Sequence, residues 1–146
     1  MKKLLAYLML LTGLCLAGQA QSLTFEQANA LFGQQKILKF RKFSLEMTDQ
    51  GIAEMEKLVK QIQQSPEMVR RNMLIIQVFT CEEELKVKPY IGVVRGQVII
   101  DYLEKAVEMP RKKCLIQDNG KNPYDTECVA GSGANLYLRP DWLGRD

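Results

Sequence analysis

The sequence predicts an α+β fold in which helices pack on a sheet that contains at least one parallel pair of strands. Residues 72–80 are almost continuously apolar and rich in β-branched side chains, as expected for a strand buried on both faces. Segments with helical spacing of apolar residues, 48–65 and 90–109, lie on either side of that strand. Because helical crossovers join parallel strands, the resulting order, β-α-β-α-β-loop-β, requires a parallel pair.

Cap signals place the elements before the first long helix. Thr24 and Gln27 can form a capping box for a short helix that ends near Phe32, before Gly33. Residues 37–43 alternate apolar and basic side chains in part, which predicts a strand with one solvated face.

Two long helices are expected. The first runs from Thr48-Asp49 to Ser65-Pro66, and the second begins at Tyr90 and ends at Met109-Pro110. Residues 81–89 contain the acidic run Glu82-Glu83-Glu84 and are expected to be a solvated loop. The apolar face of the second helix is expected to comprise Ile91, Val94, Val98, Tyr102 and Ala106.

Two further strands complete the predicted sheet. Residues 113–117 form a short strand that ends in the turn 118–120, and residues 134–138 form the last strand. The segment 121–133 between them is rich in Gly, Asn, Pro and Ser, which is typical of a loop.

Residues 1–20 are expected to be a secretory signal peptide. Lys2 and Lys3 give a positive start, an apolar stretch follows, and Gly18 and Ala20 are the small residues that a signal peptidase requires. The apolar stretch is too short for a membrane span. Leu14 before Cys15 departs from a lipobox, so lipidation is not expected. The prediction divides the chain into 1–20, an N-terminal segment 21–36 with a short helix, and a domain 37–146.

Composition argues against catalysis and against nucleic-acid binding. The chain has 20 basic and 17 acidic residues, and two of the basic ones lie in the signal peptide, so the mature charge is close to neutral. There is no histidine, the usual general base and the commonest zinc ligand. The sequence therefore predicts a protein that is not an enzyme and that has no cofactor or metal site.

The order of elements and three motifs together resemble the OmpA-like domain, the module that tethers outer-membrane proteins of Gram-negative bacteria to peptidoglycan. The first motif is Phe40 followed by 47–51, similar to an aromatic strand residue before Leu-Thr-Pro-x-Gly. The second is the helix 91–103, with Arg95 at the position of the family's arginine. The third is 118–123, which ends in a proline. The resemblance implies a two-layer β-α-β-α-β-(loop/α)-β sandwich with helices packed on a mixed sheet.

The resemblance also implies a ligand site after the second strand. In the family, an aspartate and an arginine hold the diaminopimelate residue of the peptidoglycan stem peptide, as a zwitterion requires. The arginine is present as Arg95, whereas Cys81 stands where the aspartate is expected and Glu82 is the nearest substitute. An ion pair of Arg95 with one of Glu82, Glu83 or Glu84 is an equally weighted alternative. The ligand set that follows from the resemblance is Thr80, Glu82, Arg95 and Arg139.

Two pairings of the three cysteines outside the signal peptide compete, and both involve Cys128. Short sequence separation favours Cys114–Cys128. Parallel strands, however, place Cys81 and Cys114 at opposite ends of the sheet, and Cys128 in the following loop can reach Cys81. We therefore expect a Cys81–Cys128 disulfide, with Cys114 a buried thiol, in the oxidising compartment to which the signal peptide directs the chain.

Two functions remain open at this point, and the sequence favours the first because the scaffold and Arg95 are kept. One is a non-catalytic periplasmic module that binds peptidoglycan or anchors an envelope complex to the cell wall. The other is a degenerate OmpA-like domain that has lost peptidoglycan binding and serves as a structural or interaction subunit of an envelope assembly. Both predict a location in the periplasm, associated with the outer membrane or the wall, and a partner that is an envelope or outer-membrane protein. An enzyme, for example a hydrolase of cell-wall peptides, is rejected.

Overall fold

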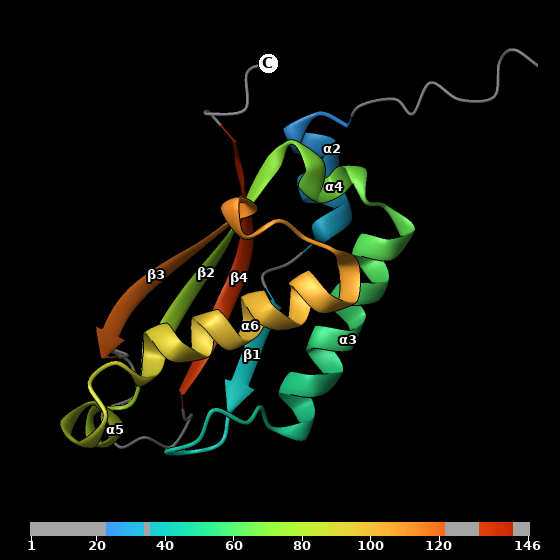
Figure 1. The fold of residues 1–146 in the computed structure, drawn as a ribbon. Helices are drawn as coiled ribbons and strands as arrows, with labels where there is room; N and C mark the ends of the chain where they lie inside the picture. The colour runs from blue at the N-terminus through green and yellow to red at the C-terminus, as the bar shows by residue number, and fades with distance from the viewer. Residues whose placement is uncertain (1–22, 34–35, 122–131, 142–146) are drawn as a thin grey trace, which may run out of the picture.

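The structure, a computed structural model, describes residues 23–33, 36–121 and 132–141. Its centre is a four-stranded mixed sheet in the order β1-β4-β2-β3 (Figure 1). β2 and β3 are parallel, and β4 runs antiparallel to both β1 and β2. The predicted α+β fold with a parallel pair is therefore confirmed. The strands are β1 (Lys36–Phe40), β2 (Asn72–Thr80), β3 (Cys114–Lys121) and β4 (Ser132–Pro140).

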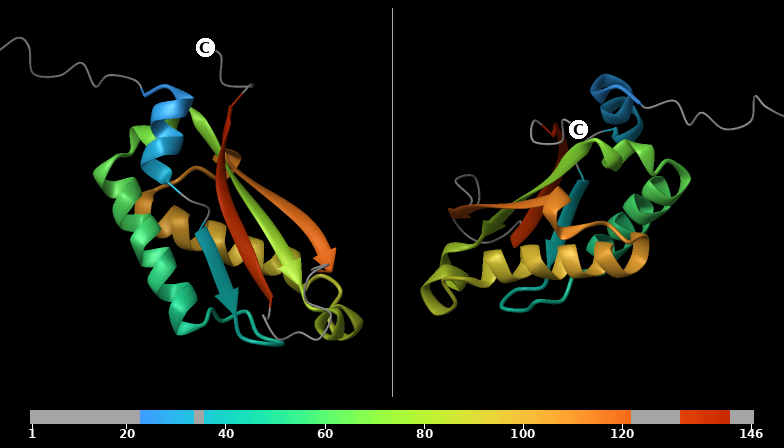
Figure 2. Two further views of the ribbon diagram at one scale, coloured as in Figure 1. Left: turned by 180° about the vertical axis from the view of Figure 1, so that it is seen from behind. Right: turned by 45° about the horizontal axis from the view of Figure 1, so that its top comes forward.

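The helices form the second layer. α6 (Ile91–Val107) packs on β2 and β3, α3 (Asp49–Gln64) packs beside β1, and the two helices contact each other. Seen from behind, the sheet lies in front of α6, and α3 stands beside β1 at the edge of the sheet (Figure 2). The shorter helices are α2 (Phe25–Phe32), α4 (Glu67–Arg70), α5 (Glu82–Val87) and the 3₁₀ helix η1 (Arg111–Lys113). Within the described ranges, no helix is long and apolar enough to cross a membrane.

The core lies between the two layers. Side chains from β1, β2, β4, α3 and α6 meet there and are almost completely withdrawn from solvent. β2 occupies an inner position and is buried along most of its length, as its apolar run predicts. The innermost members include Leu38, Leu74, Ile76, Leu136, Leu58, Ile99 and Leu103.

The predicted caps of α2 and α3 are confirmed. Thr24 and Gln27 form the capping box, and Gly33 ends α2 with φ 74°. Thr48 caps α3 by accepting a hydrogen bond from the backbone N–H of Gly51 at 3.1 Å. A Cβ at Gly51 would lie 2.4 Å from the carbonyl oxygen of Lys39, so only glycine allows α3 to begin this close to β1.

Three predicted boundaries are wrong. β1 ends at Phe40 and does not reach residue 43, because the chain turns away and Phe43 adopts φ 56°. β3 continues past the predicted turn 118–120 to Lys121, although its register with β2 shifts there, between the Val78–Asp118 and Thr80–Lys121 pairs, and Gly120 adopts φ 61°. The predicted loop 81–89 contains α5, whose first turn holds three glutamates that interact favourably with the helix dipole.

The predicted face of α6 is correct at Ile91, which is buried, but wrong at two of its other positions. Val94 and Tyr102 are 41% and 40% exposed, whereas Arg95, Ile99 and Leu103 are buried. Gly96 explains why a different face of α6 is buried from the one predicted. A Cβ at Gly96 would come within 3 Å of the Ile116 side chain, so α6 approaches β3 closely on its glycine side. The buried face also contains Gly92, Arg95 and Gly96, which a search for apolar side chains at helical spacing does not detect.

Candidate functional site

Arg95 lies at the centre of the candidate site and is only 1% exposed. Its Nε donates to the carbonyl oxygen of Ser44 at 2.9 Å, and Nη2 donates to that of Arg41 at 3.0 Å. Nη2 and Nη1 donate to the carboxylate of Glu84 at 2.6 and 3.3 Å. The guanidinium also lies 5.2 Å from the centre of the Phe40 ring. Four of the five guanidinium N–H groups are thereby used within the protein.

Glu84 is the partner of Arg95 and is fully buried. Besides Arg95, its carboxylate accepts hydrogen bonds from the backbone N–H of Phe43 at 2.7 Å and from the hydroxyl of Ser132. Burial on its own raises the pKa of the carboxyl, but the bonds from Arg95, Ser132 and Phe43 outweigh it and lower the pKa to about 2. Glu84 is therefore ionised at neutral pH.

This ion pair joins four distant parts of the chain. The loop after β1 supplies Arg41, Phe43 and Ser44, while α5, α6 and the start of β4 supply Glu84, Arg95 and Ser132. Each charge is matched by the other and by backbone groups, which is the condition for burying it. The arrangement holds the loop 41–44 in place.

The four predicted ligand residues do not form one site. Thr80 ends β2 with its side chain buried, and its Oγ1 has no hydrogen-bond partner among the described residues. Glu82 pairs with Lys86 and Lys121, and those two bonds lower its pKa. Arg139 pairs with Met73 near the start of β2, at the opposite end of the sheet from Thr80. Arg139 is therefore not part of this site.

Of the two readings of Arg95, the structure supports the internal ion pair, and it selects Glu84. The prediction of a solvated acidic run is wrong at this residue. The signal for Glu84 lay in its position, since a helix that begins directly after Cys81 turns its third residue inward. No signal in the sequence points to Ser132, which reaches the pair only through the tertiary fold.

Cys81, which the sequence resemblance aligns with the family's aspartate, is disulfide-bonded. Its backbone N–H donates to the hydroxyl of Ser132 at 3.0 Å. Cys114 is a free thiol beside Leu74 at the far end of β2; it is half-buried, not fully buried as predicted, and burial raises its pKa to about 11. Cys15, Cys128 and the signal peptide lie outside the described residues, so the Cys81–Cys128 pairing stays a proposal.

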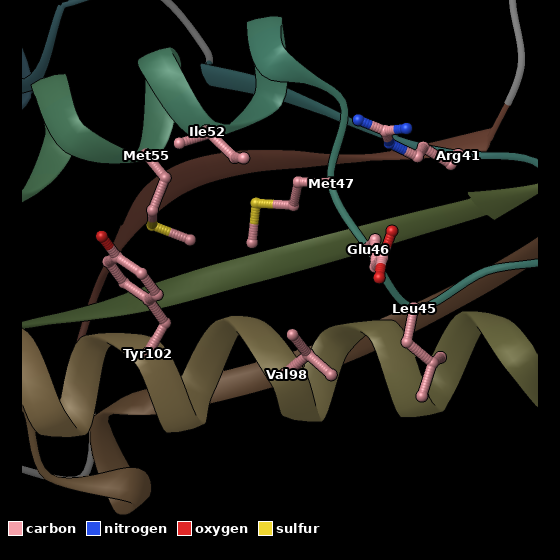
Figure 3. Close-up of a pocket in the computed structure, with 8 residues that line it drawn as sticks. All are labelled: Arg41, Leu45, Glu46, Met47, Ile52, Met55, Val98 and Tyr102. Atoms are coloured by element: carbon pink, nitrogen blue, oxygen red, sulfur yellow. The ribbon is translucent and has the colours of Figure 1, made fainter.

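A second feature is a groove between α3 and α6, with a volume of about 300 Å³. Figure 3 shows Ile52 and Met55 reaching from α3 toward Val98 and Tyr102 on α6, with Met47 between them. Leu45, Glu46 and Arg41 complete the lining at one end. The described residues contain no group of three or more side chains able to hold a metal ion.

Comparison with known proteins identifies the fold. No protein-family model matches the chain, and no curated protein matches it. In structure, the chain is similar to the periplasmic domain of Helicobacter pylori MotB, residues 78–256, with a TM-score of 0.54 and 15% identity over 74% of this chain and 78% of that one. A second crystal structure of that domain, residues 90–256, has the same TM-score and identity and covers 74% of this chain and 75% of that one. The chain thus has an OmpA-like fold, as the sequence motifs implied.

Proposed function

We propose that this protein is a non-catalytic, periplasmic subunit of a cell-envelope assembly, whose OmpA-like domain holds a partner protein and does not bind diaminopimelate in the manner of the family. The observation that carries this proposal is the Glu84–Arg95 pair. The family's arginine needs an accessible guanidinium to take the carboxylate of a ligand. Here Arg95 is 1% exposed, and the carboxylate it binds belongs to the chain itself.

The surroundings of the pair support the same conclusion. Cys81, which replaces the family's aspartate, is disulfide-bonded and cannot supply a carboxylate to a ligand ammonium. Glu82, the nearest substitute, is engaged by Lys86 and Lys121. The chain has the OmpA-like fold and a predicted signal peptide. The proposed location is therefore the periplasm, at the outer membrane or the cell wall.

Peptidoglycan binding is the second candidate, and the fold itself favours it. In this function, the domain binds the stem peptide or anchors an envelope complex to the wall. Binding in the family manner requires Glu84 to leave Arg95, so that a ligand carboxylate replaces it. Glu84 lies on α5, a helix of only 6 residues, which is the element that would have to move.

Co-sedimentation of the mature chain with purified sacculi tests the proposal. We expect no more protein in the pellet than for an unrelated periplasmic protein, at low and at physiological salt. Glu84→Gln removes the charge partner of Arg95. Glu83→Gln on the same helix is the matched control. Glu83 is exposed and, among the described residues, pairs only with Lys42. Wild-type protein in the pellet, displaced by soluble stem peptide, would overturn the proposal and establish the second candidate.

A further inference from the structure

The groove between α3 and α6 gathers large apolar side chains that the fold leaves in contact with solvent. Leu45, Ile52 and Tyr102 are 43%, 45% and 40% exposed, and all three line the same hollow. Val94, 41% exposed, continues this surface along α6. Apolar residues that are exposed together around one concavity, with a polar rim, mark an interaction site.

We propose that this groove is the docking surface for an amphipathic helix of a partner protein, with a basic residue beside its apolar face. The proposal rests on the proposed function, which requires a protein partner. Two helices form the walls of the groove, and its floor contains Met47 and Met55 (Figure 3). Flexible thioethers adapt to side chains that enter between helices.

The charges at the rim define the partner further. Arg41 forms an exposed ion pair with Asp49 at 3.5 Å, so it already has a partner within the chain. Glu46 forms no ion pair with any residue in 23–33, 36–121 or 132–141, although it lines the groove. A partner that covers the groove brings its own charge close to Glu46, and a cation there is favourable whereas an anion is repelled. The complementary segment therefore carries lysine or arginine at that end.

Synthetic helical peptides of about four turns test the groove. They carry leucine at positions i, i+3, i+4 and i+7 and are flanked by lysine in one version and by glutamate in the other. Binding is followed by amide chemical shifts of the mature chain. We expect the lysine version to bind more tightly and to perturb α3 and α6. Ile52→Lys should weaken it by about tenfold or more, the effect of removing an anchoring contact.

Ile37→Lys is the matched control, because Ile37 is 56% exposed on β1 and does not line the groove. It should leave binding within about twofold, which lies inside the usual range of neutral surface contacts. Glu46→Lys should reverse the preference between the two peptides. Equal binding by wild type and Ile52→Lys, or perturbation away from the groove, overturns the proposal. So does the absence of binding combined with a dimer of the chain that Ile52→Lys disrupts, because the occupant is then a second copy.

The two proposals fail separately. Sacculus binding overturns the proposed function while peptide binding in the groove persists. If the peptides do not bind in the groove, the docking proposal fails. The sacculus result and the argument from the Glu84–Arg95 pair are not affected.

Discussion

The carboxylate of Glu84 lies 2.6 Å from the guanidinium of Arg95, and neither side chain reaches solvent. The pair occupies the place where the OmpA-like family is expected to take a ligand carboxylate. Under the proposed function, the protein's own acid takes the role of the ligand carboxylate, and the buried arginine is part of the core. This substitution has consequences for stability, for its pH dependence and for what the site accepts when Glu84 is removed.

Removal of the charge of Glu84 should destabilise the domain strongly. Glu84→Gln leaves Arg95 buried without a counter-ion, and breaking a buried pair in this way costs about 3–5 kcal/mol. Glu83→Gln removes an exposed pair with Lys42 and should cost about 0–1 kcal/mol. Urea unfolding followed by circular dichroism measures both. Equal midpoints for the two variants would contradict a structural role for the pair.

The same pair predicts a loss of stability in acid. The pKa of Glu84 is lowered from 4.5 to about 2 in the folded protein, so its contribution is fully present above the unfolded value. As pH falls from about 5 to about 2, the unfolded chain takes up the proton first, and stability of the order of 3 kcal/mol is lost. Unfolding midpoints over this window should fall more steeply for the wild type than for Glu84→Gln. Parallel slopes would show that other carboxyls dominate.

Small carboxylates should rescue a truncated Glu84. Glu84→Ala leaves a space bordered by the Arg95 guanidinium, the N–H of Phe43 and the hydroxyl of Ser132, all donors in the native protein. Formate or acetate at ten times the dissociation constant should raise the free energy of unfolding of this variant by about 1.4 kcal/mol. Chloride at the same ionic strength and the wild-type protein are the controls. A similar response to chloride would show a general salt effect.

The cysteines should differ in chemistry. Burial raises the pKa of Cys114 to about 11, so little thiolate is present at neutral pH and alkylation of the folded protein should be slow. Unfolding without reductant should release one reactive thiol in the mature chain. Mass spectrometry of the non-reduced digest should then find Cys81 joined to Cys128 and Cys114 alkylated. Recovery of a Cys114–Cys128 peptide would contradict the proposed Cys81–Cys128 disulfide.

Much of the fold follows from local patterns. The limits of β2 match residues 72–80, and Thr24 and Thr48 cap the helices that they precede, because these signals depend on neighbouring residues alone. The parallel arrangement of β2 and β3 follows from the helix between them. The three motifs implied the same fold as the similar structures, even though the sequence identity with them is only 15%.

The site depends on the tertiary structure. The sequence by itself determined that Arg95, inside an apolar helix, needs an anionic partner, and it supplied three adjacent glutamates. Which of them is buried was decided by α5, which turns Glu84 inward, and by the loop after β1 and Ser132, which bring their donors to the same carboxylate. Those contacts join residues about forty to fifty positions apart, so no local pattern records them. The groove also depends on the tertiary structure. Close packing of α6 on β3 at Gly96 leaves Val94 and Tyr102 of α6 exposed to solvent.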